Sequence, residues 1–361
     1  MKTVLVTAIG SFAADIVIKM QEAGYTVIGC DIYQKEWLAD AYQVDFFYQA
    51  PLVSDVEAYQ KFILNLCQEH RVEYIFPLTD IEVDFYNKNR EVFEKSGVTI
   101  CISSEEAIDI CRNKMRLNQY LQKNNICSVI PTVMLQEAKI QELDYPAVVK
   151  PTNGRSSQGL FYIESAEQME NFVRNQDISN YIVQPKISGG IITVDVVRNQ
   201  ETQTTQCVAR KELLRTLNGA GTTVYVFHDS VLEKQCRELA AVLGVNGCVN
   251  FEFIETDSGE HFFMECNPRF SGGVEFSCIA GYDCVRNHLR CFTGEEIEGK
   301  EDLKNQYEFD SSEYVAEMVW DIKTVLCKKS WFGEGQMIQF EDIKVKAPKD
   351  IDSFLKVYYG D

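Results

Sequence analysis

The sequence predicts a protein of the α/β and α+β classes, with an N-terminal parallel sheet followed by a largely antiparallel second half. Residues 1–100 alternate short apolar strands with helical segments, which is typical of βαβ units with right-handed crossovers. After Pro131 the strands increasingly follow one another through turns, which favours antiparallel pairing. A chain of 361 residues has room for two or three domains.

Composition narrows the class of protein further. The hydrophobic fraction of 45% and charged fraction of 25% are ordinary for a globular chain. A net charge of −19 argues against nucleic acid or an anionic membrane as a partner over a broad surface, and no apolar run is long enough to span a membrane. Thirteen cysteines without a C-x-x-C pair indicate reduced thiols, no zinc and a cytoplasmic location. The apolar N-terminus fits a buried first strand better than a signal peptide.

The first hundred residues contain the elements of the predicted parallel sheet. Short β-branched or apolar runs predict its strands, and periodic runs between them predict its helices. The strands are Thr3–Thr7, Thr26–Asp31, Tyr74–Pro77 and Val98–Ile102, and the helices are Phe12–Ala23, Val56–His70 and Val83–Ser96. Ser103 and Glu106 then form an S-x-x-E capping box, which predicts a helix that continues through Leu121.

The second half begins with a small α+β unit and continues as an antiparallel sheet. The unit has strands at Tyr145–Lys150, Leu160–Ile163 and Tyr181–Gln184 and a helix at Ala166–Asn175. The sheet is expected from strands at Ile191–Arg198 and Thr205–Leu213, a helix at Leu232–Leu243 and a hairpin around Asp257-Ser258-Gly259. Residues 300–361 are charged and carry no legible motif.

The hairpin segment VNFEFIETDSGEHFFMECN, residues 249–267, predicts a metal site. A two-residue turn at Ser258-Gly259 pairs Asp257 with Glu260 and thereby places Glu252 opposite Glu265. Strand alternation gives a core face and a polar face. The core face would carry Phe251, Phe253, Met264 and Cys266, and the polar face Asn250, Glu252, Glu265 and Asn267. Opposed carboxylates repel unless a cation lies between them, so the pair favours Mg²⁺, although a solvated polar face fits the pattern equally well.

Basic residues near glycines suggest a phosphate-binding region. Lys150 ends a strand and is followed by the loop Thr152–Gly159, whose glycines allow backbone N–H groups to approach phosphate oxygens. Lys114 falls within the predicted helix, and Arg210, Lys211 and Arg215 cluster before Gly219-Ala220-Gly221. Each feature by itself fits an ordinary surface as well as a binding site.

In their order along the chain, these segments resemble the ATP-grasp superfamily, and most closely carbamoyl-phosphate synthase large subunits, biotin carboxylases and amino-acid ligases. The resemblance covers about residues 105–295, with weaker agreement over 1–100. Three segments carry it, namely MECNPRFSGG (264–273), VVKPTNGRSSQG (148–159) and IVQPKISGG (182–190). It implies a pre-ATP-grasp domain at 1–104, a lid subdomain with its connecting helix at 105–187, a large subdomain with the metal site at 188–300 and an extension of unknown role at 301–361.

The resemblance also implies a role for each matching residue. Lys114 and Lys150 would hold ATP phosphates beneath the loop that carries Gly154, Ser156, Ser157 and Gly159. Gln184 and Ile187 would flank the adenine through backbone groups, and Glu252, Glu265 and Asn267 would bind Mg²⁺ or Mn²⁺. Arg269 and Arg210, with Lys150, would stabilise the transferring phosphoryl group. Ile191 stands where many members place a ribose-binding carboxylate, and Asp195 is the nearest acidic residue on that side of the strand.

The reaction implied is phosphorylation of a small carboxylate to an acyl phosphate, which an amine or a thiol then attacks, in a protein that could be a homodimer. Alternatives are a non-ligating ATP-binding protein, a kinase, and an NAD(P)-dependent oxidoreductase. The segment AIGSFA (8–13) has one glycine where the dinucleotide fingerprint has three, which disfavours the last alternative. If Glu252 and Glu265 repel each other, Glu265→Gln should leave the metal-free protein equally or slightly more stable. The sequence does not identify the acid or the amine.

Overall fold

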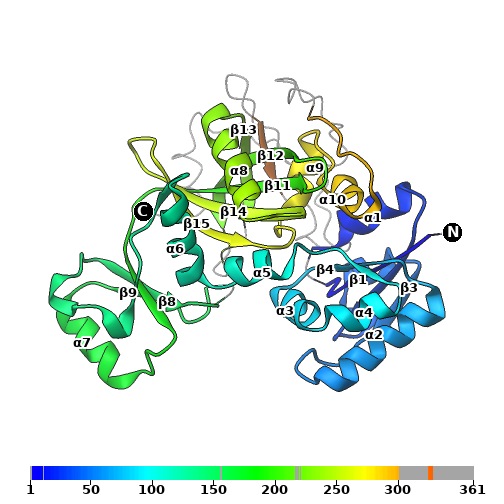
Figure 1. The fold of residues 1–361 in the computed structure, drawn as a ribbon, viewed down its shortest axis with the longest axis horizontal. Helices are drawn as coiled ribbons and strands as arrows, with labels where there is room; N and C mark the ends of the chain where they lie inside the picture. The colour runs from blue at the N-terminus through cyan, green and yellow to red at the C-terminus, as the bar shows by residue number, and fades with distance from the viewer. Residues whose placement is uncertain are drawn as a thin grey trace, which may run out of the picture.

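The structure is a computed structural model that describes residues 2–10, 12–154, 157–215, 219, 221–300 and 324–327. It contains three sheets, of five, four and seven strands. Figure 1 shows the five-stranded N-terminal sheet at the lower right, the four-stranded sheet at the lower left and the seven-stranded sheet above and between them. The predicted fold class is confirmed.

The N-terminal sheet is parallel, with strand order β3-β2-β1-β4-β5. Its chain order reverses between β1 and β4, so a crevice opens at the carboxyl ends of these two strands. The strands are β1 (Thr3–Thr7), β2 (Thr26–Asp31), β3 (Phe46–Gln49), β4 (Tyr74–Pro77) and β5 (Thr99–Ile100). The elements that connect and cover them are α1 (Ala14–Glu22), η1 (Lys35–Trp37), η2 (Ala39–Tyr42), α2 (Val56–His70), α3 (Asp80–Lys88) and α4 (Arg90–Lys95). The sequence analysis did not predict β3, a short edge strand whose first residue, Phe46, is exposed.

Two helices predicted as continuous are interrupted. Asn89 separates α3 from α4, and its side chain donates to the carbonyl of Phe85. The helix expected through Leu121 divides into α5 (Glu105–Cys111) and α6 (Lys114–Asn124). Ser104, not Ser103, caps α5 by accepting from the N–H of Ala107. The predicted capping box was therefore wrong, because the cap lies one residue later and Ala107, at its third position, has no side chain that could complete the box. Asn113 caps α6, which moves Lys114 from mid-helix to a helix start.

The four-stranded sheet has the order β7-β10-β8-β9 and antiparallel pairing. It lies in the segment expected to be the lid and is called the lid below. Its strands are β7 (Val133–Met134), β8 (Ala147–Pro151), β9 (Phe161–Ile163) and β10 (Tyr181–Pro185). Helix α7 (Ala166–Asn175) packs through Met169 on Ala147, Val149 and Val183. The connection before β8 contains η3 (Leu135–Glu137) and η4 (Ile140–Glu142).

The seven-stranded sheet has the order β16-β13-β12-β11-β14-β15-β6 and is antiparallel except where β6 joins β15. Its strands are β6 (Ser128–Val129), β11 (Gly190–Asn199), β12 (Thr204–Arg215), β13 (Gly221–Phe227), β14 (Gly247–Glu255), β15 (His261–Asn267) and β16 (Thr324–Cys327). The helices are α8 (Ser230–Val242), α9 (Val274–Ile279) and α10 (Cys284–Thr293). Leu232 and Leu239 of α8 share one core with Val194 of β11. Val285 of α10 shares another with Val197, on the opposite face of the same strand.

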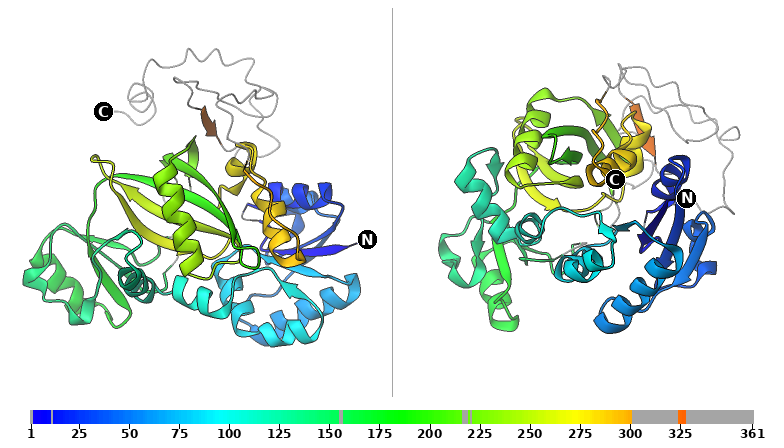
Figure 2. Two further views of the ribbon diagram at one scale, coloured as in Figure 1. Left: turned by 45° about the horizontal axis from the view of Figure 1, so that its top comes forward. Right: turned by 45° about the vertical axis from the view of Figure 1, so that its right-hand side comes forward.

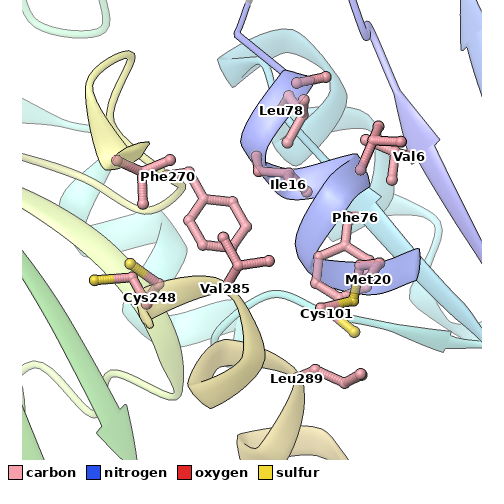
Figure 3. Close-up of a cluster of buried hydrophobic side chains, with 14 of the residues drawn as sticks. Val6, Ile16, Met20, Phe76, Leu78, Cys101, Cys248, Phe270, Val285 and Leu289 are labelled. Atoms are coloured by element: carbon pink, nitrogen blue, oxygen red, sulfur yellow. The ribbon is translucent and has the colours of Figure 1, made fainter. Parts of the chain in front are cut away.

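The N-terminal domain and the large sheet share a continuous hydrophobic core. Phe76, Ile16 and Met20 from the N-terminal side lie against Phe270, Val285 and Leu289 from the large subdomain, as Figure 3 shows. Figure 2 shows α9 and α10, in gold, between the N-terminal domain and the large sheet. An ion pair between Arg286 and Glu22, 2.9 Å apart, lies at the same contact. This shared core fixes the crevice of the parallel sheet relative to the hairpin of the large sheet.

Candidate functional site

A cavity of about 810 Å³ lies where the three sheets meet. This volume lies within the range of small-molecule sites. The N-terminal sheet contributes Phe12 after β1 and residues 78–81 after β4, which lie at the carboxyl ends of the two strands that flank its crevice. The lid contributes β8, the end of β10 and the glycine-rich loop, and the large sheet contributes one face of β11, β12, β14 and β15.

The predicted carboxylate pair lies on the floor of this cavity. Glu252 of β14 is directly opposite Glu265 of β15, as the sequence analysis expected. The predicted turn register was wrong, because Glu255 pairs with His261 and the chain turns through residues 256–260. A register shift beside Glu252 leaves Met264 as an additional residue and restores the expected pairing. The bulge puts Phe263 in the core and Met264 in the cavity, which corrects the prediction that Met264 is a core residue.

The two carboxylates have different electrostatic surroundings. Burial and repulsion from Glu265 raise the pKa of Glu252 to about 8. Burial alone would raise the pKa of Glu265 as well, but Lys114 and Lys150 outweigh it and hold that pKa below its ordinary value. Lys114 Nζ lies 3.4 Å from a Glu265 oxygen. Glu265 is therefore the member of the pair that keeps its charge, and Glu252 is the member that more readily holds a proton.

Both predicted phosphate-binding lysines line the cavity. Lys150 is the last residue but one of β8 and is 7% exposed. Burial lowers its pKa to about 8, although Glu265 partly opposes this effect. Lys114 begins α6 and donates a 2.8 Å hydrogen bond to the carbonyl of Gly154. The two ammonium groups are close enough for Lys114 to contribute to lowering the pKa of Lys150. An anion bound between them would relieve this repulsion.

The glycine-rich loop lies at the cavity edge, with Gly154 and Ser157 among the lining residues. Gly159 has φ +71° and lies against Pro151, where an added Cβ would be 2.9 Å from the ring, so a side chain would be strained there. Ser157 also faces the large subdomain, because its Oγ lies 3.6 Å from the Cβ position of Gly219. Ser156, also predicted to bind phosphate, lies outside the described residues.

The predicted adenine-flanking residues lie at the opposite end of the cavity, where β10 leaves the lid. Gln184 and Ile187 both line it. The side-chain amide nitrogen of Gln184 donates to Thr132 Oγ1 at 2.7 Å, which fixes the orientation of this side chain. Gly189 follows at the start of the large sheet, where a Cβ would lie 2.2 Å from the carbonyl oxygen of Glu255. This close approach of two backbones requires glycine.

The two predicted catalytic arginines are held by internal carboxylates. Arg269 follows β15 and donates to Asp80 at 2.9 Å, which links the large subdomain to the start of α3. Arg210 of β12 is 1% exposed and pairs with Asp195, and it also donates to Ser271 and Ser277. Burial would lower the pKa of Arg210, but Asp195 outweighs it and the pKa lies above its ordinary value. Both guanidinium groups border the cavity with their positions fixed.

Asp195, the acidic residue considered from the sequence, and Asp31, the last residue of β2, both serve internal contacts. Asp195 is 0% exposed and accepts from Arg210 and Ser277, so it does not reach a ribose. Asp31 ends β2 but accepts from the N–H groups of Gly10 and Tyr33. Leu38 Cδ2 lies 2.6 Å from the Cβ position of Gly10, so its side chain fills the space above the single glycine. Both contacts disfavour a dinucleotide at this position.

Two further cavity residues, Asp80 and Glu212, were not identified as site residues from the sequence, and Arg215 was noted only as a member of a basic cluster. Asp80 is buried between Arg112 and Arg269, and these two arginines lower its pKa despite its burial. Glu212 of β12 accepts from Thr193 at 2.6 Å, and its second oxygen lies 2.6 Å from Arg215 Nε. Arg215 also approaches Glu252, at 3.8 Å. Only the strand pairing places Glu212 beside the hairpin carboxylates, because 40 residues separate it from Glu252.

The donor set of the hairpin fits a hard divalent cation. Asn267 Nδ2 lies 3.2 Å from a Glu252 oxygen and 3.3 Å from a Glu265 oxygen. Because amide N and O positions are interchangeable by rotation, the same side chain can present Oδ1 to a cation between the carboxylates. Two carboxylates and one amide oxygen suit Mg²⁺, which commonly completes its coordination with phosphate oxygens and water. Among the described residues no group of three or more His, Cys, Asp or Glu side chains could hold a metal.

The site thus has a backbone-lined end and a strongly charged end. The charged end combines the hairpin carboxylates, two lysines and two arginines that neighbouring carboxylates hold in place. Such an arrangement can neutralise a polyphosphate and stabilise charge that develops during phosphoryl transfer. In the described part of the chain no helix is long and apolar enough to cross a membrane.

Two family models match the chain. Residues 4–101 match the model described as PylC-like, N-terminal domain, and residues 177–315 match the model described as ATP-grasp in the biosynthetic pathway with Ter operon. The large chain of the arginine-specific carbamoyl phosphate synthase of Bacillus subtilis (strain 168) is 20% identical over an alignment of 297 residues, and this alignment covers 78% of this chain. The alignment spans only 28% of that relative's length.

Solved structures agree with this fold. The biotin carboxylase domain of Hydrogenobacter thermophilus 2-oxoglutarate carboxylase, solved with MgADP and bicarbonate, gives a TM-score of 0.70 at 18% identity and covers 84% of this chain and 72% of its own. N5-carboxyaminoimidazole synthetase from Staphylococcus aureus, solved with ADP, gives 0.66 at 17% identity and covers 82% of this chain and 79% of its own. These similarities show a shared fold.

Proposed function

The chain belongs to the ATP-grasp superfamily, and from that premise we propose that it is an ATP- and Mg²⁺-dependent ligase that joins a small carboxylate to an amine. One observation carries the proposal. Lys114 of helix α6, Lys150 of the lid strand β8 and the carboxylates of the β14–β15 hairpin converge in a single cavity. Solvated surface residues would not be expected to converge in this way.

The proposal assigns a role to each part of the cavity. The adenine lies at the hinge between Gln184 and Ile187, and the phosphates lie between the two lysines beneath the loop with Gly154, Ser157 and Gly159. Glu252, Glu265 and Asn267 are the residues that would hold Mg²⁺. When bound, Mg²⁺ supplies positive charge to the phosphate oxygens and relieves the repulsion between the two carboxylates.

The chemistry has two steps, and the described residues act by positioning and charge. In the first, an oxygen of the substrate carboxylate attacks the γ-phosphorus, the bond to the β-phosphate oxygen breaks and ADP leaves. In the second, the amine nitrogen attacks the acyl carbon, phosphate leaves with the bonding electrons and the nitrogen loses a proton. Arg269 and Arg210, fixed by Asp80 and Asp195, stabilise the negative charge that develops on the transferring phosphoryl group. A thiol could replace the amine in the second step.

A screen of ADP release tests this function. Pairs of small carboxylates and amines, amino acids included, are incubated with Mg-ATP, and the expected result is ADP release that requires both members of a pair. Added hydroxylamine should give a hydroxamate of the same acid. Lys150→Met should lower turnover by at least about a hundredfold, because buried phosphate charge loses its partner. Lys139→Met, at an exposed lid position, should not change turnover.

Other outcomes would identify the alternatives. ADP release with a carboxylate alone and a stable phosphorylated product would indicate a kinase. Nucleotide binding without turnover for any pair would favour a non-ligating ATP-binding protein. Tight binding of NAD(P)H, measured by its fluorescence, would contradict the contacts that Asp31 and Leu38 make around Gly10.

A further inference from the structure

Arg112, at the break between α5 and α6, contacts two carboxylates of α3. Asp80 and Asp84 are four positions apart, so they lie on one face of that helix, where like charges repel. The Arg112 guanidinium donates to the two oxygens of Asp84 at 2.8 and 2.9 Å and to Asp80 Oδ1 at 3.1 Å. Its side chain is 13% exposed. A guanidinium held by three bonds has a fixed orientation, so Arg112 fixes Asp80 relative to the α5–α6 junction.

The other oxygen of Asp80 holds Arg269. Asp80 Oδ2 accepts from Arg269 Nη2 at 2.9 Å, and Arg269 Nη1 donates to the carbonyl of Phe270 at 2.9 Å. Each of the two arginines therefore uses one oxygen of a carboxylate that is 3% exposed. While Arg112 holds Oδ1, Asp80 cannot turn both of its oxygens toward Arg269.

From this geometry we propose that Arg112 is a positioning residue for Arg269 and that it acts through Asp80. Asp80 and Arg269 are among the described residues that line the cavity, and Arg112 is not. Without Arg112, Asp80 would be free to form a two-bond pair with Arg269. Such a pair would turn the guanidinium toward α3 and neutralise the charge that it offers to the transferring phosphoryl group. The inference rests on the role of Arg269 in the proposed function and adds to it a residue that contacts no reacting group.

Turnover and nucleotide binding are measured separately to test this role. ADP release gives kcat with the carboxylate–amine pair found in the screen, and calorimetry gives the dissociation constant of Mg-ADP. Arg112→Met should lower kcat at least about tenfold and change that constant by less than about threefold, because the loss falls on the transition state. Arg112→Lys keeps a positive charge and should recover part of kcat. The matched control is Asp84→Asn, at a side chain that is 36% exposed, which leaves the bond from Arg112 to Asp80 and should keep the kcat of the wild type.

A double-mutant cycle with Arg269→Met separates positioning from a general structural role. If Arg112 acts through Arg269, then Arg112→Met should lower kcat no further in the Arg269→Met background. The denaturant midpoint should show the opposite pattern. Arg112→Met should lower it more in that background than in the wild type, because the buried Asp80 then has neither guanidinium.

Three results would overturn the inference. The first is an unchanged kcat in Arg112→Met, and the second is an equal loss of kcat in Asp84→Asn. The third is a loss of kcat by the same factor with and without Arg269, which would show that Arg112 does not act through that residue. If no carboxylate–amine pair gives ADP release, the proposed function fails and the catalytic part of this inference fails with it. Additive shifts of the denaturant midpoint, which need no substrate, would contradict the link through Asp80 in either case.

Discussion

At the scale of single residues, the hairpin carboxylates are unequal partners in what the sequence shows as a symmetrical pair. Glu265 lies 3.4 Å from Lys114, and Lys114 and Lys150 lower its pKa below the ordinary value despite its burial. The basic group nearest to Glu252 is Arg215, whose guanidinium lies 3.8 Å away and offsets the cost of burying this carboxylate less well. Burial therefore raises the pKa of Glu252 to about 8. The structure therefore changes the expectation that Glu265→Gln is neutral or stabilising in the metal-free protein.

The substitutions Glu252→Gln and Glu265→Gln should have opposite effects on the stability of the protein. Glu252→Gln should stabilise the metal-free protein at pH 7 to 8 by about 1–3 kcal/mol. The pKa of Glu252 is higher in the folded than in the unfolded protein, so this carboxyl destabilises the fold once the pH rises above its pKa in the unfolded chain. Glu265→Gln should destabilise it by a similar amount, because Lys114 and Lys150 lose their shared carboxylate. Thermal melts with and without Mg-ATP measure both changes.

The same variants test the site. Each should lose Mg²⁺-dependent turnover, and Asp257→Asn in the exposed turn of the hairpin should change neither stability nor turnover. A more stable metal-free Glu265→Gln protein would show that the lysines do not compensate this carboxylate. Normal turnover by Glu265→Gln would remove the hairpin from the mechanism.

At the scale of elements, the glycine-rich loop depends on the break between α5 and α6. Because Asn113 caps a new helix, Lys114 stands at its first residue and reaches across to the carbonyl of Gly154. The same ammonium contacts Glu265 of the large sheet. One lysine thus connects the loop of the lid with the hairpin of the large subdomain.

This arrangement predicts how the loop responds to nucleotide. Peptides covering Thr152–Gly159 should exchange their amide hydrogens at least about tenfold more slowly with Mg-ATP bound, because the polar loop buries little apolar surface of its own. In Lys114→Met the nucleotide-free loop should exchange faster than in the wild type, since the bond to Gly154 is lost. Arg116→Met, an exposed position two residues along the same helix, is the control. Equal exchange with and without nucleotide would contradict a closing role for the loop.

At the scale of the whole molecule, the core shared by the N-terminal domain and the large subdomain contains a buried histidine. His288 of α10 is 4% exposed and accepts from the N–H of Cys248 at 2.7 Å. Its ring lies 5.2 Å from Phe76 of the N-terminal sheet and 4.6 Å from Phe270 of the large subdomain. Burial in these apolar surroundings lowers the pKa of His288 to about 3.

The interface should consequently be acid-sensitive. The pKa of a histidine in the unfolded chain is about 6.5, whereas that of His288 in the folded protein is about 3. The stability that His288 contributes to the fold is therefore fully present above about pH 6.5 and decreases as the pH falls from there toward about 3, because the unfolded chain then binds a proton that the folded protein does not. Between pH 7 and pH 5 the loss from His288 should be about 2 kcal/mol in the free energy of unfolding. Denaturant titrations of the wild type and His288→Asn at both pH values measure it.

The variant keeps an acceptor for Cys248 but cannot be protonated, so its stability should fall less between pH 7 and pH 5. His228→Asn, at a side chain that is 63% exposed, should follow the wild type. The same pH dependence in His288→Asn and the wild type would show that the histidine does not remain neutral in the folded interface.

The sequence by itself determined the fold class, the order of the three sheets and the candidate residues of the site. Hydrophobic periodicity depends on residues that are near one another in the chain, and it predicted β1, β2, β4, α2, α7 and the carboxylate hairpin. The motifs MECNPRFSGG and VVKPTNGRSSQG predicted the superfamily, because each lies within one short segment. The pairing of Glu252 with Glu265 was also predicted correctly, although the turn register used to derive it was not.

Tertiary structure alone decided which charged groups meet. Lys114 and Glu265 are 151 positions apart, and Asp80 and Arg269 are 189 apart, so local patterns carry no information about either contact. The bulge at Met264 and the break before Lys114 depend on partners outside their own segments. The physical reason is that pKa values and ligand contacts depend on distance in space, which the packing of the three sheets sets. The partnering of Asp195 with Arg210 and the inequality of Glu252 and Glu265 were therefore visible only in the folded chain.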